Sequence, residues 1–235
     1  MMFCIFRREN LLDMPSITSL HLDTTGWNAL SQSAQQMIWQ HDATGDVLSI
    51  EFFNHPTKLP FAMNDVEAIK AHHEQYSVRP DEGAIVSIDL VSLHGPEAVR
   101  MIIKARNPRI AGLPPHGMTY LGSLMIPLAG FSYVVKVQCC ERGTTGLREA
   151  GVALILNPKS SKPTGEVKVV KSLEEMFAAR SQRPIVRTPA DDERYDTMFP
   201  QHPLSRVRTY LNHVEQTIKI DSDVQTARRV EASLS

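Results

Sequence analysis

Residues 133–150, YVVKVQCCERGTTGLREA, hold the most chemically suggestive set of side chains in this chain. Cys139 and Cys140 end an apolar run, and a loop of glycines and threonines follows. Backbone N–H groups of such a loop, where it opens a helix, can hold an anion, and nearby arginines add positive charge. The candidate anion-binding residues are Arg142, Gly143, Thr144, Thr145 and Arg148.

A purely structural interpretation of the same loop stays open. Gly143 and Gly146 would permit a tight turn from strand to helix, and Thr144 or Thr145 would cap the helix. The arginines would then face solvent or pair with the neighbouring glutamates, Glu141 and Glu149.

No catalytic motif accompanies this loop. A cysteine phosphatase needs an arginine at a fixed distance after the nucleophilic cysteine, and the corresponding positions hold Thr145 and Gly146. The chain has neither a Gly-x-Ser-x-Gly elbow nor a nucleotide loop that ends in Lys-Ser or Lys-Thr. We therefore predict no catalytic residue and no cofactor, and interpret both thiols as small buried apolar groups.

The histidines and acidic residues form no pattern typical of a metal site. His72 and His73 are consecutive, so on a helix they diverge by about 100°. His116 and His202 lie in proline-rich loops, where a ligand or general-base role is open but an internally hydrogen-bonded histidine is favoured. The acidic run 191–196, DDERYD, is typical of a solvated loop. No metal ion is predicted.

Composition places the chain among ordinary globular proteins. It has 235 residues, of which 42% are hydrophobic and 22% charged, enough for one substantial core. A formal net charge of −1 provides no field that would attract nucleic acid or an anionic membrane. The three cysteines, an odd number with two of them adjacent, argue against a disulfide framework and favour a reducing, cytoplasmic location.

The sequence predicts one domain with flexible N- and C-terminal ends. We predict a flexible N-terminal extension over residues 1–14, with either Met1 or Met14 as the start. A single α+β domain would span 15–220 and include an irregular, proline-rich segment at 181–203 that wraps the surface. A frayed tail would follow at 221–235.

Residues 110–135 lack Asp, Glu, Lys and Arg and are long enough to cross a bilayer. Prolines and glycines interrupt the stretch, so two buried strands joined by a turn at PLAGF are favoured over a membrane helix.

Alternation of apolar and polar residues predicts the strands of the sheet. Residues 36–53 indicate a hairpin, and 83–93 indicate a further strand. Residues 95–108 fit a helix or a strand, with the strand favoured by the alternation of Val99, Met101 and Ile103. Two more strands are expected within 118–128 and 132–141.

Helical periodicity appears at four places. Residues 63–76 predict a helix capped by Asn64 or Asp65, and the spacing from Ser172 to Glu175 is that of a capping box. A short helix within 143–156 would turn Leu147, Ala150 and Leu154 toward the core. The clearest helix lies within 202–220, with Pro203 in its first turn and an apolar face of Leu204, Val207, Leu211, Val214 and Ile218.

The predicted fold class is therefore α+β, an antiparallel sheet of about six strands flanked by helices, with a long C-terminal amphipathic helix. This element order over roughly residues 25–220, and SYVVKVQCCERGTTGLREA with the final helix above all, resembles the PsbP-like α/β/α sandwich. That group includes the extrinsic photosystem subunit PsbP, the mycobacterial lipoprotein LpqN and a nuclear Ran-binding import factor. The resemblance implies a binding protein without a shared catalytic centre, and it transfers no functional residue.

The predicted function is a soluble, non-enzymatic binding or protein-interaction role. The expected partner is a protein, met at the sheet edge, at 191–196 or at the loop 114–117, because loops on a rigid scaffold commonly carry recognition. One alternative is an enzyme or small-ligand protein that acts on an anionic substrate through the 141–148 loop. Another is a self-associating homo-oligomer.

Overall fold

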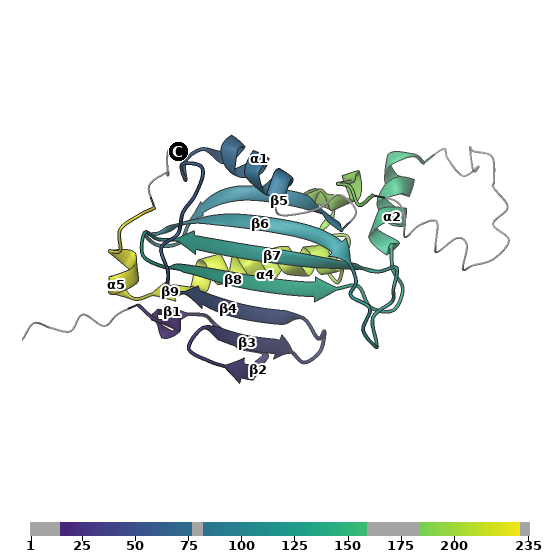
Figure 1. Cartoon of the computed structure of the whole chain (residues 1–235). Coiled ribbons are helices and arrows are strands. Elements are labelled where there is room, and N and C mark those ends of the chain that lie inside the picture. The colour runs from purple at the N-terminus through teal and green to yellow at the C-terminus, as the bar shows by residue number, and fades with distance from the viewer. Residues whose placement is uncertain (1–14, 77–81, 159–183, 231–235) are drawn as a thin grey trace, which may run out of the picture.

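A seven-stranded antiparallel sheet forms the centre of the computed structural model, which describes residues 15–76, 82–158 and 184–230 (Figure 1). The strand order is β2-β3-β4-β8-β7-β6-β5, and a separate pair joins β1 to β9. The strands are β1 Leu20–His21, β2 Trp27–Gln32, β3 Gln36–His41, β4 Val47–Phe53, β5 Gly83–Ser92, β6 Glu97–Arg106, β7 Met118–Pro127, β8 Ser132–Cys140 and β9 Lys219–Ile220.

Helices lie on both faces of this sheet and at its ends (Figure 1). The α-helices are α1 Val66–Tyr76, α2 Leu147–Leu156, α4 Pro203–Thr217 and α5 Ser222–Gln225, and the 3-10 turns are η1 Ile17–Ser19, η2 Pro189–Asp191 and η3 Glu193–Tyr195. No described helix is both long and apolar enough to cross a membrane.

Helix α4 runs along one face of the sheet, behind the strands in Figure 1. All five predicted apolar positions of this helix are buried, and Pro203 occupies its first turn, as predicted. The helix packs on β7 and β8. The contact is close at Gly122, where an added Cβ would lie 2.6 Å from Val207 Cγ1 and 2.7 Å from Leu211 Cδ1. A side chain at this position would push the helix off the sheet.

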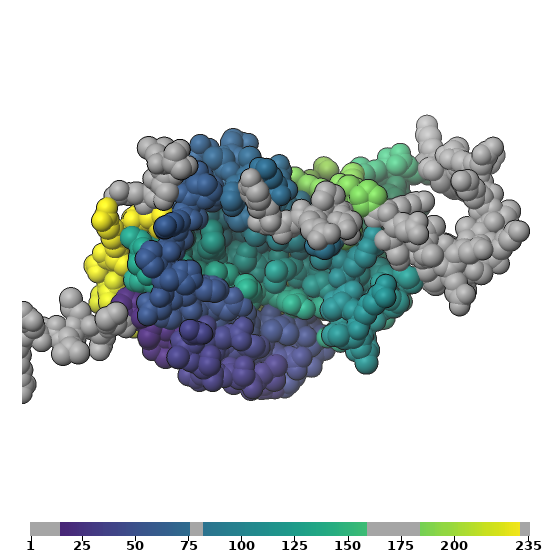
Figure 2. Space-filling model, viewed as in Figure 1, coloured from purple at the N-terminus to yellow at the C-terminus, as the bar shows by residue number. Residues whose placement is uncertain are grey.

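On the opposite face, α1 and the segment before it cover only part of the sheet. Asp65 caps this helix, as predicted, by accepting a hydrogen bond of 2.9 Å from the Ala68 N–H. Ile69 is buried and joins Phe61, Ile88 and Val99 in a second apolar cluster. In the space-filling view, teal strand atoms remain at the surface beside the blue segment that includes α1 (Figure 2).

The strand predictions are confirmed, including the strand form of β6 and the hairpin of β7 and β8 across the PLAGF turn. The strands that were missed are the short pair β1 and β9, whose second member lies inside the range predicted as the final helix, and β2, which pairs with β3 at the edge of the sheet. The residues of β2 are mostly exposed, so no apolar alternation marks this strand in the sequence.

The predicted core face of α2 is wrong. Leu147 and Leu154 are 60% and 66% exposed, whereas Arg148 and Val152 face inward. The threonine cap is also wrong, because Gly146, at φ 76°, is the N-cap and no side chain caps the helix. Only glycine adopts this left-handed conformation readily.

Residues 221–230 form ordered structure where a frayed tail was expected. Helix α5 begins at Ser222, and Val224 is completely buried. The Ala129 N–H donates to the Arg228 carbonyl, so this segment closes over the β7–β8 turn. The predicted capping box at Ser172 and Glu175 lies outside the described residues.

Candidate functional site

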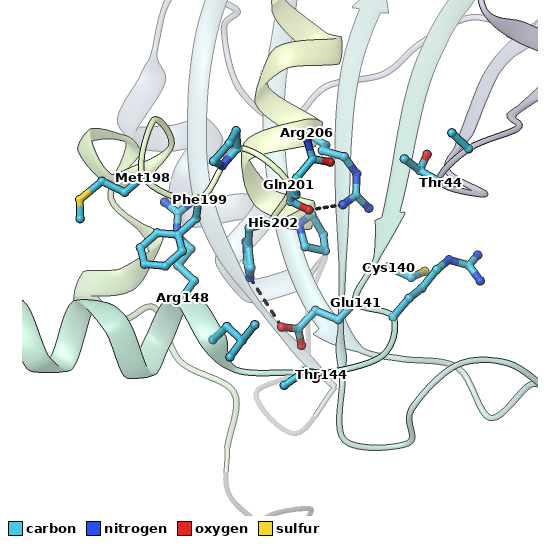
Figure 3. Close-up of a pocket in the computed structure, with 15 residues that line it drawn as sticks. Thr44, Cys140, Glu141, Thr144, Arg148, Met198, Phe199, Gln201, His202 and Arg206 are labelled. Atoms are coloured by element: carbon cyan, nitrogen blue, oxygen red, sulfur yellow. Dashed lines mark hydrogen bonds and ion pairs between the residues drawn. The ribbon is translucent and has the colours of Figure 1, made fainter.

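A cavity of about 520 Å³ opens where β8 ends and α2 begins, facing residues 198–203 and the start of α4 (Figure 3). Its apolar lining includes Leu147, Met198 and Phe199. Its polar lining includes Arg142 and, more deeply buried, Glu141. A concave apolar surface with a few convergent polar groups is typical of a binding site.

Glu141 organises the loop that leads from β8 to α2. Its Oε1 accepts from the Gly146 N–H at 3.0 Å, and its Oε2 accepts from the Met118 N–H at 2.8 Å. Burial works to raise the pKa of this carboxyl, but the neighbouring His202 and the two amides outweigh it and hold the pKa below its usual value. The loop thus contains its own anion, bound at the start of a helix.

The predicted anion-binding residues do not converge on one point. Arg142 is exposed, and its guanidinium lies 3.4 Å from the Gly45 carbonyl oxygen. Gly143 and Thr144 are also exposed, and Thr144 lines the cavity (Figure 3). Thr145 is half-buried near Gly117.

Arg148 lies inside the protein, with none of its surface exposed. Its Nη1 donates to Asp196 Oδ1 and to Ser205 Oγ, both at 2.7 Å. Its Nε donates to the Ala190 carbonyl at 2.6 Å, and Nη2 donates to the Asp192 carbonyl at 2.8 Å. The side chain therefore anchors residues 190–196 to α2 and α4 rather than pairing with the glutamates of its own loop.

The acidic run 191–196 is not the solvated loop that was expected. Asp191 is buried and forms an ion pair with Lys104 of β6. Arg208 donates to both carboxylate oxygens of Asp196, at 2.9 and 3.1 Å. Buried acids need such partners, so this run attaches its segment to the end of the sheet.

Residues 184–202 also contribute to a small core rather than only wrapping the surface. Ala190 and Tyr195 are buried against Val152 of α2, with Phe199 packed beside them. This cluster fixes the position of α2 relative to the cavity.

A second ion pair, between Arg206 and Asp46, lies at the wall of the cavity that Arg206 lines. Arg206 of α4 forms a two-pronged pair with Asp46, with Nε–Oδ2 at 2.7 Å and Nη2–Oδ1 at 2.9 Å. Asp46 is buried in the β3–β4 turn. The pair holds the β3–β4 turn against α4, and Arg142 contacts Gly45 of the same turn.

Both cysteines of β8 are unbridged and buried, as the sequence interpretation expected. Burial, and then the nearby Asp46 carboxylate, raise the pKa of the Cys139 thiol well above its usual value. The Cys140 Sγ lies 3.3 Å from Thr119 Oγ1. The Cys139 thiol is thus protonated at neutral pH and unsuited to nucleophilic chemistry.

His202 lies beside the cavity and close to two glutamates, the buried Glu141 and the half-buried Glu149. Its Nδ1 accepts from the Leu204 N–H at 3.2 Å and so caps α4, while Nε2 lies 3.7 Å from Glu141 Oε1 (Figure 3). Glu149 of α2 completes a group of three whose nearest ligand atoms all lie within 4.8 Å of one another. Tyr120 stacks edge-on against the His202 ring, with centroids 5.3 Å apart.

The sequence contained no local signal for this group. Glu141 and Glu149 were considered only as partners for the loop arginines, and His202 only as a loop histidine. They belong to three separate segments, and only the packing of α2 and α4 on the end of the sheet brings them together.

Similarity to known proteins is confined to solved structures. No family model matches the chain, and no curated protein sequence does. Among solved structures, the chain is similar to the Ran-binding protein Mog1p of Saccharomyces cerevisiae, with 10% identity, a TM-score of 0.42, and coverage of 85% of this chain and 88% of that one.

Two further structures show the range of similarity. A mutant of protein Mog1 gives 9% identity and a TM-score of 0.42 over 86% of this chain and 90% of that one. A structure from Bacteroides thetaiotaomicron gives 8% identity and a TM-score of 0.32, and the match covers 53% of this chain and 40% of that one. Mog1p, a Ran-binding protein, falls within the group that the sequence resemblance named. At TM-scores below 0.5, these similarities carry no argument about the fold or role of this chain.

Proposed function

We propose that this chain is a non-catalytic protein-binding module that holds a segment of a partner polypeptide in the cavity between α2 and residues 198–203. The observation that carries the proposal is the pair of apolar side chains at this cavity, Leu147 at 60% and Met198 at 56% exposure. Large apolar side chains that gather beside a cavity are typical of interaction sites.

The exposed face of α2 extends this apolar surface. Leu147 and Leu154 lie seven residues apart, so they share one side of the helix. Both are well exposed, because the other side of α2 uses Arg148 and Val152 to attach to the body of the protein. A partner that packed here would bury apolar surface that this chain leaves in water.

Arg142 defines the charge of the expected partner segment. Among the described residues no carboxylate pairs with it, whereas Arg148 and Arg206 are both held by aspartates. An acidic side chain next to an apolar anchor would complement this arrangement. The proposed ligand is therefore a peptide segment with a large apolar residue flanked by Asp or Glu.

Selection from a random peptide display library tests this proposal. We expect enriched peptides to combine an apolar residue with a nearby acid. Binding, measured by fluorescence anisotropy, should weaken at least tenfold, about 1.4 kcal/mol, in the Leu147→Ser, Met198→Ser double variant. Both side chains are exposed, so these changes leave the core intact.

Leu30→Ser is the matched control, because Leu30 is also exposed but lies on β2. It should bind the selected peptides as the unchanged protein does. The proposal fails if no peptide is enriched, or if the double variant binds the enriched peptides as tightly as the control.

The alternative from the sequence is a small anionic ligand at Arg142, Gly143, Thr144 and Thr145. Two observations weigh against an anion at this loop. The Glu141 carboxylate already accepts the Gly146 N–H, and Arg148 is buried. A thermal shift with inorganic phosphate that disappears in Arg142→Ala would favour this alternative over a peptide.

A further inference from the structure

We propose that Glu141, Glu149 and His202 form a binding site for a divalent transition-metal ion, with Zn²⁺ as the best match. Among the described residues, these three offer a nitrogen and two carboxylate oxygens within 4.8 Å of one another. The side chains of Glu141 and His202 are 6% and 7% exposed. One imidazole with two carboxylates is a ligand set that suits zinc.

Two atoms of this group are buried without a hydrogen-bond partner, His202 Nε2 and Glu149 Oε2. Buried polar atoms almost always have partners, so two unsatisfied atoms in one group of possible ligands indicate a missing ligand. A cation bound there would satisfy the Glu149 oxygen and, once the His202 proton has moved to Nδ1, the His202 Nε2 lone pair as well.

The distances fit a small ion after a modest adjustment. Zinc bonds of about 2.0–2.2 Å in tetrahedral geometry place ligand atoms roughly 3.4 Å apart. His202 Nε2 and Glu141 Oε1 are 3.7 Å apart, close to this value. Glu149 lies in the first turn of α2 and is only half-buried, so its carboxylate has room to close the remaining distance.

Each proposed ligand is positioned by a different element. Two backbone amides fix the Glu141 carboxylate, Glu149 lies in the first turn of α2, and His202 occupies the N-cap position of α4. Glu141 also lines both the cavity of about 520 Å³ and a neighbouring one of about 250 Å³. Three protein ligands beside open space leave a further coordination position accessible, as in zinc sites that bind an exchangeable group.

The hydrogen bond from the Leu204 N–H gives the proposal a distinctive signature. Because Nδ1 accepts that bond, a neutral His202 carries its proton on Nε2. Metal binding at Nε2 requires the proton to move to Nδ1, which breaks the cap of α4. Histidine bound to metal should therefore appear as the opposite tautomer from the metal-free protein.

Calorimetric titration of the full chain with ZnCl₂, followed by thermal unfolding, tests the site. We expect one bound ion that is lost, or weakened at least tenfold, in Glu149→Gln. His202→Asn should lose it equally, because asparagine keeps an N-cap acceptor but removes Nε2. Glu97→Gln is the matched control, because Glu97 is exposed and begins β6, at the end of the sheet away from the proposed site. It should bind zinc as the unchanged protein does.

A second measurement separates this site from zinc bound elsewhere. Imidazole ¹⁵N spectra should show the His202 proton moving from Nε2 to Nδ1 as Zn²⁺ is added, and MgCl₂ at the same concentration should leave them unchanged. The proposal is overturned if Zn²⁺ does not bind, if both site variants bind it as tightly as Glu97→Gln, or if the His202 tautomer does not change.

Discussion

Arg142 and Arg148 lie at the two ends of the same short loop, but one is exposed and the other is buried. Arg142 stays at the surface with one long contact to a carbonyl oxygen. Arg148 makes four hydrogen bonds inside the protein, to Asp196, to Ser205 and to two carbonyls of the segment that covers the sheet. Residue type alone gives no sign of this division, because both arginines have the same donors.

Arg148→Ala should lower the free energy of unfolding by about 3–5 kcal/mol, since it leaves buried acceptors without their donor. Arg142→Ala should change it by no more than about 0.5 kcal/mol. Urea denaturation of the two variants measures both values. Equal effects in the two would show that Arg148 is not the anchor of residues 190–196.

At the scale of elements, the contact of α4 with the sheet depends on a missing side chain. Gly122 of β7 lets Val207 and Leu211 approach the strand directly. The same helix then carries His202 and Arg206 to the cavity at its first turn. The depth at which α4 sits therefore sets the position of both side chains.

Gly122→Ala should destabilise the protein by about 1–3 kcal/mol, because its Cβ overlaps two buried side chains. Gly130→Ala is the matched control, since a Cβ there would have no atom within 4 Å. Thermal unfolding of both variants checks the difference. A Gly122→Ala protein as stable as the control would mean that α4 moves away from β7 without cost.

At the scale of the whole molecule, the C-terminal segment closes the end of the sheet opposite to the cavity (Figure 1). Val224 of α5 reaches the main core, and Arg229 pairs with Leu128 at the end of β7. Residues 221–230 are thus part of the folded domain and contribute to its stability.

Val224→Ala should cost about 2 kcal/mol, because it removes two buried methyl groups. Val186→Ala, at a valine that is 57% exposed, should stay within about 0.5 kcal/mol of the unchanged protein. Denaturant midpoints, compared at equal m-values, measure the difference in stability between the two variants. A Val224 variant indistinguishable from the Val186 variant would leave α5 outside the cooperative fold.

Local pattern in the sequence determined most of the elements. Alternation predicted β3 to β8, and the three-and-four spacing predicted α4, because a strand or helix with one buried face must repeat its apolar residues at its own period. The same rule failed for β2, which is exposed, and for α2, whose apolar residues face outward.

Only the tertiary structure decided the candidate site. Glu141, Glu149 and His202 meet because α2 and α4 dock at one end of the sheet, and Arg148 is enclosed because residues 190–196 fold over it. Contacts between distant segments leave no periodic trace in the sequence, since they depend on how the elements pack and not on any single element. Sequence thus determined the α+β sheet and its main helices, and packing decided which charged residues became anchors and which could bind a ligand.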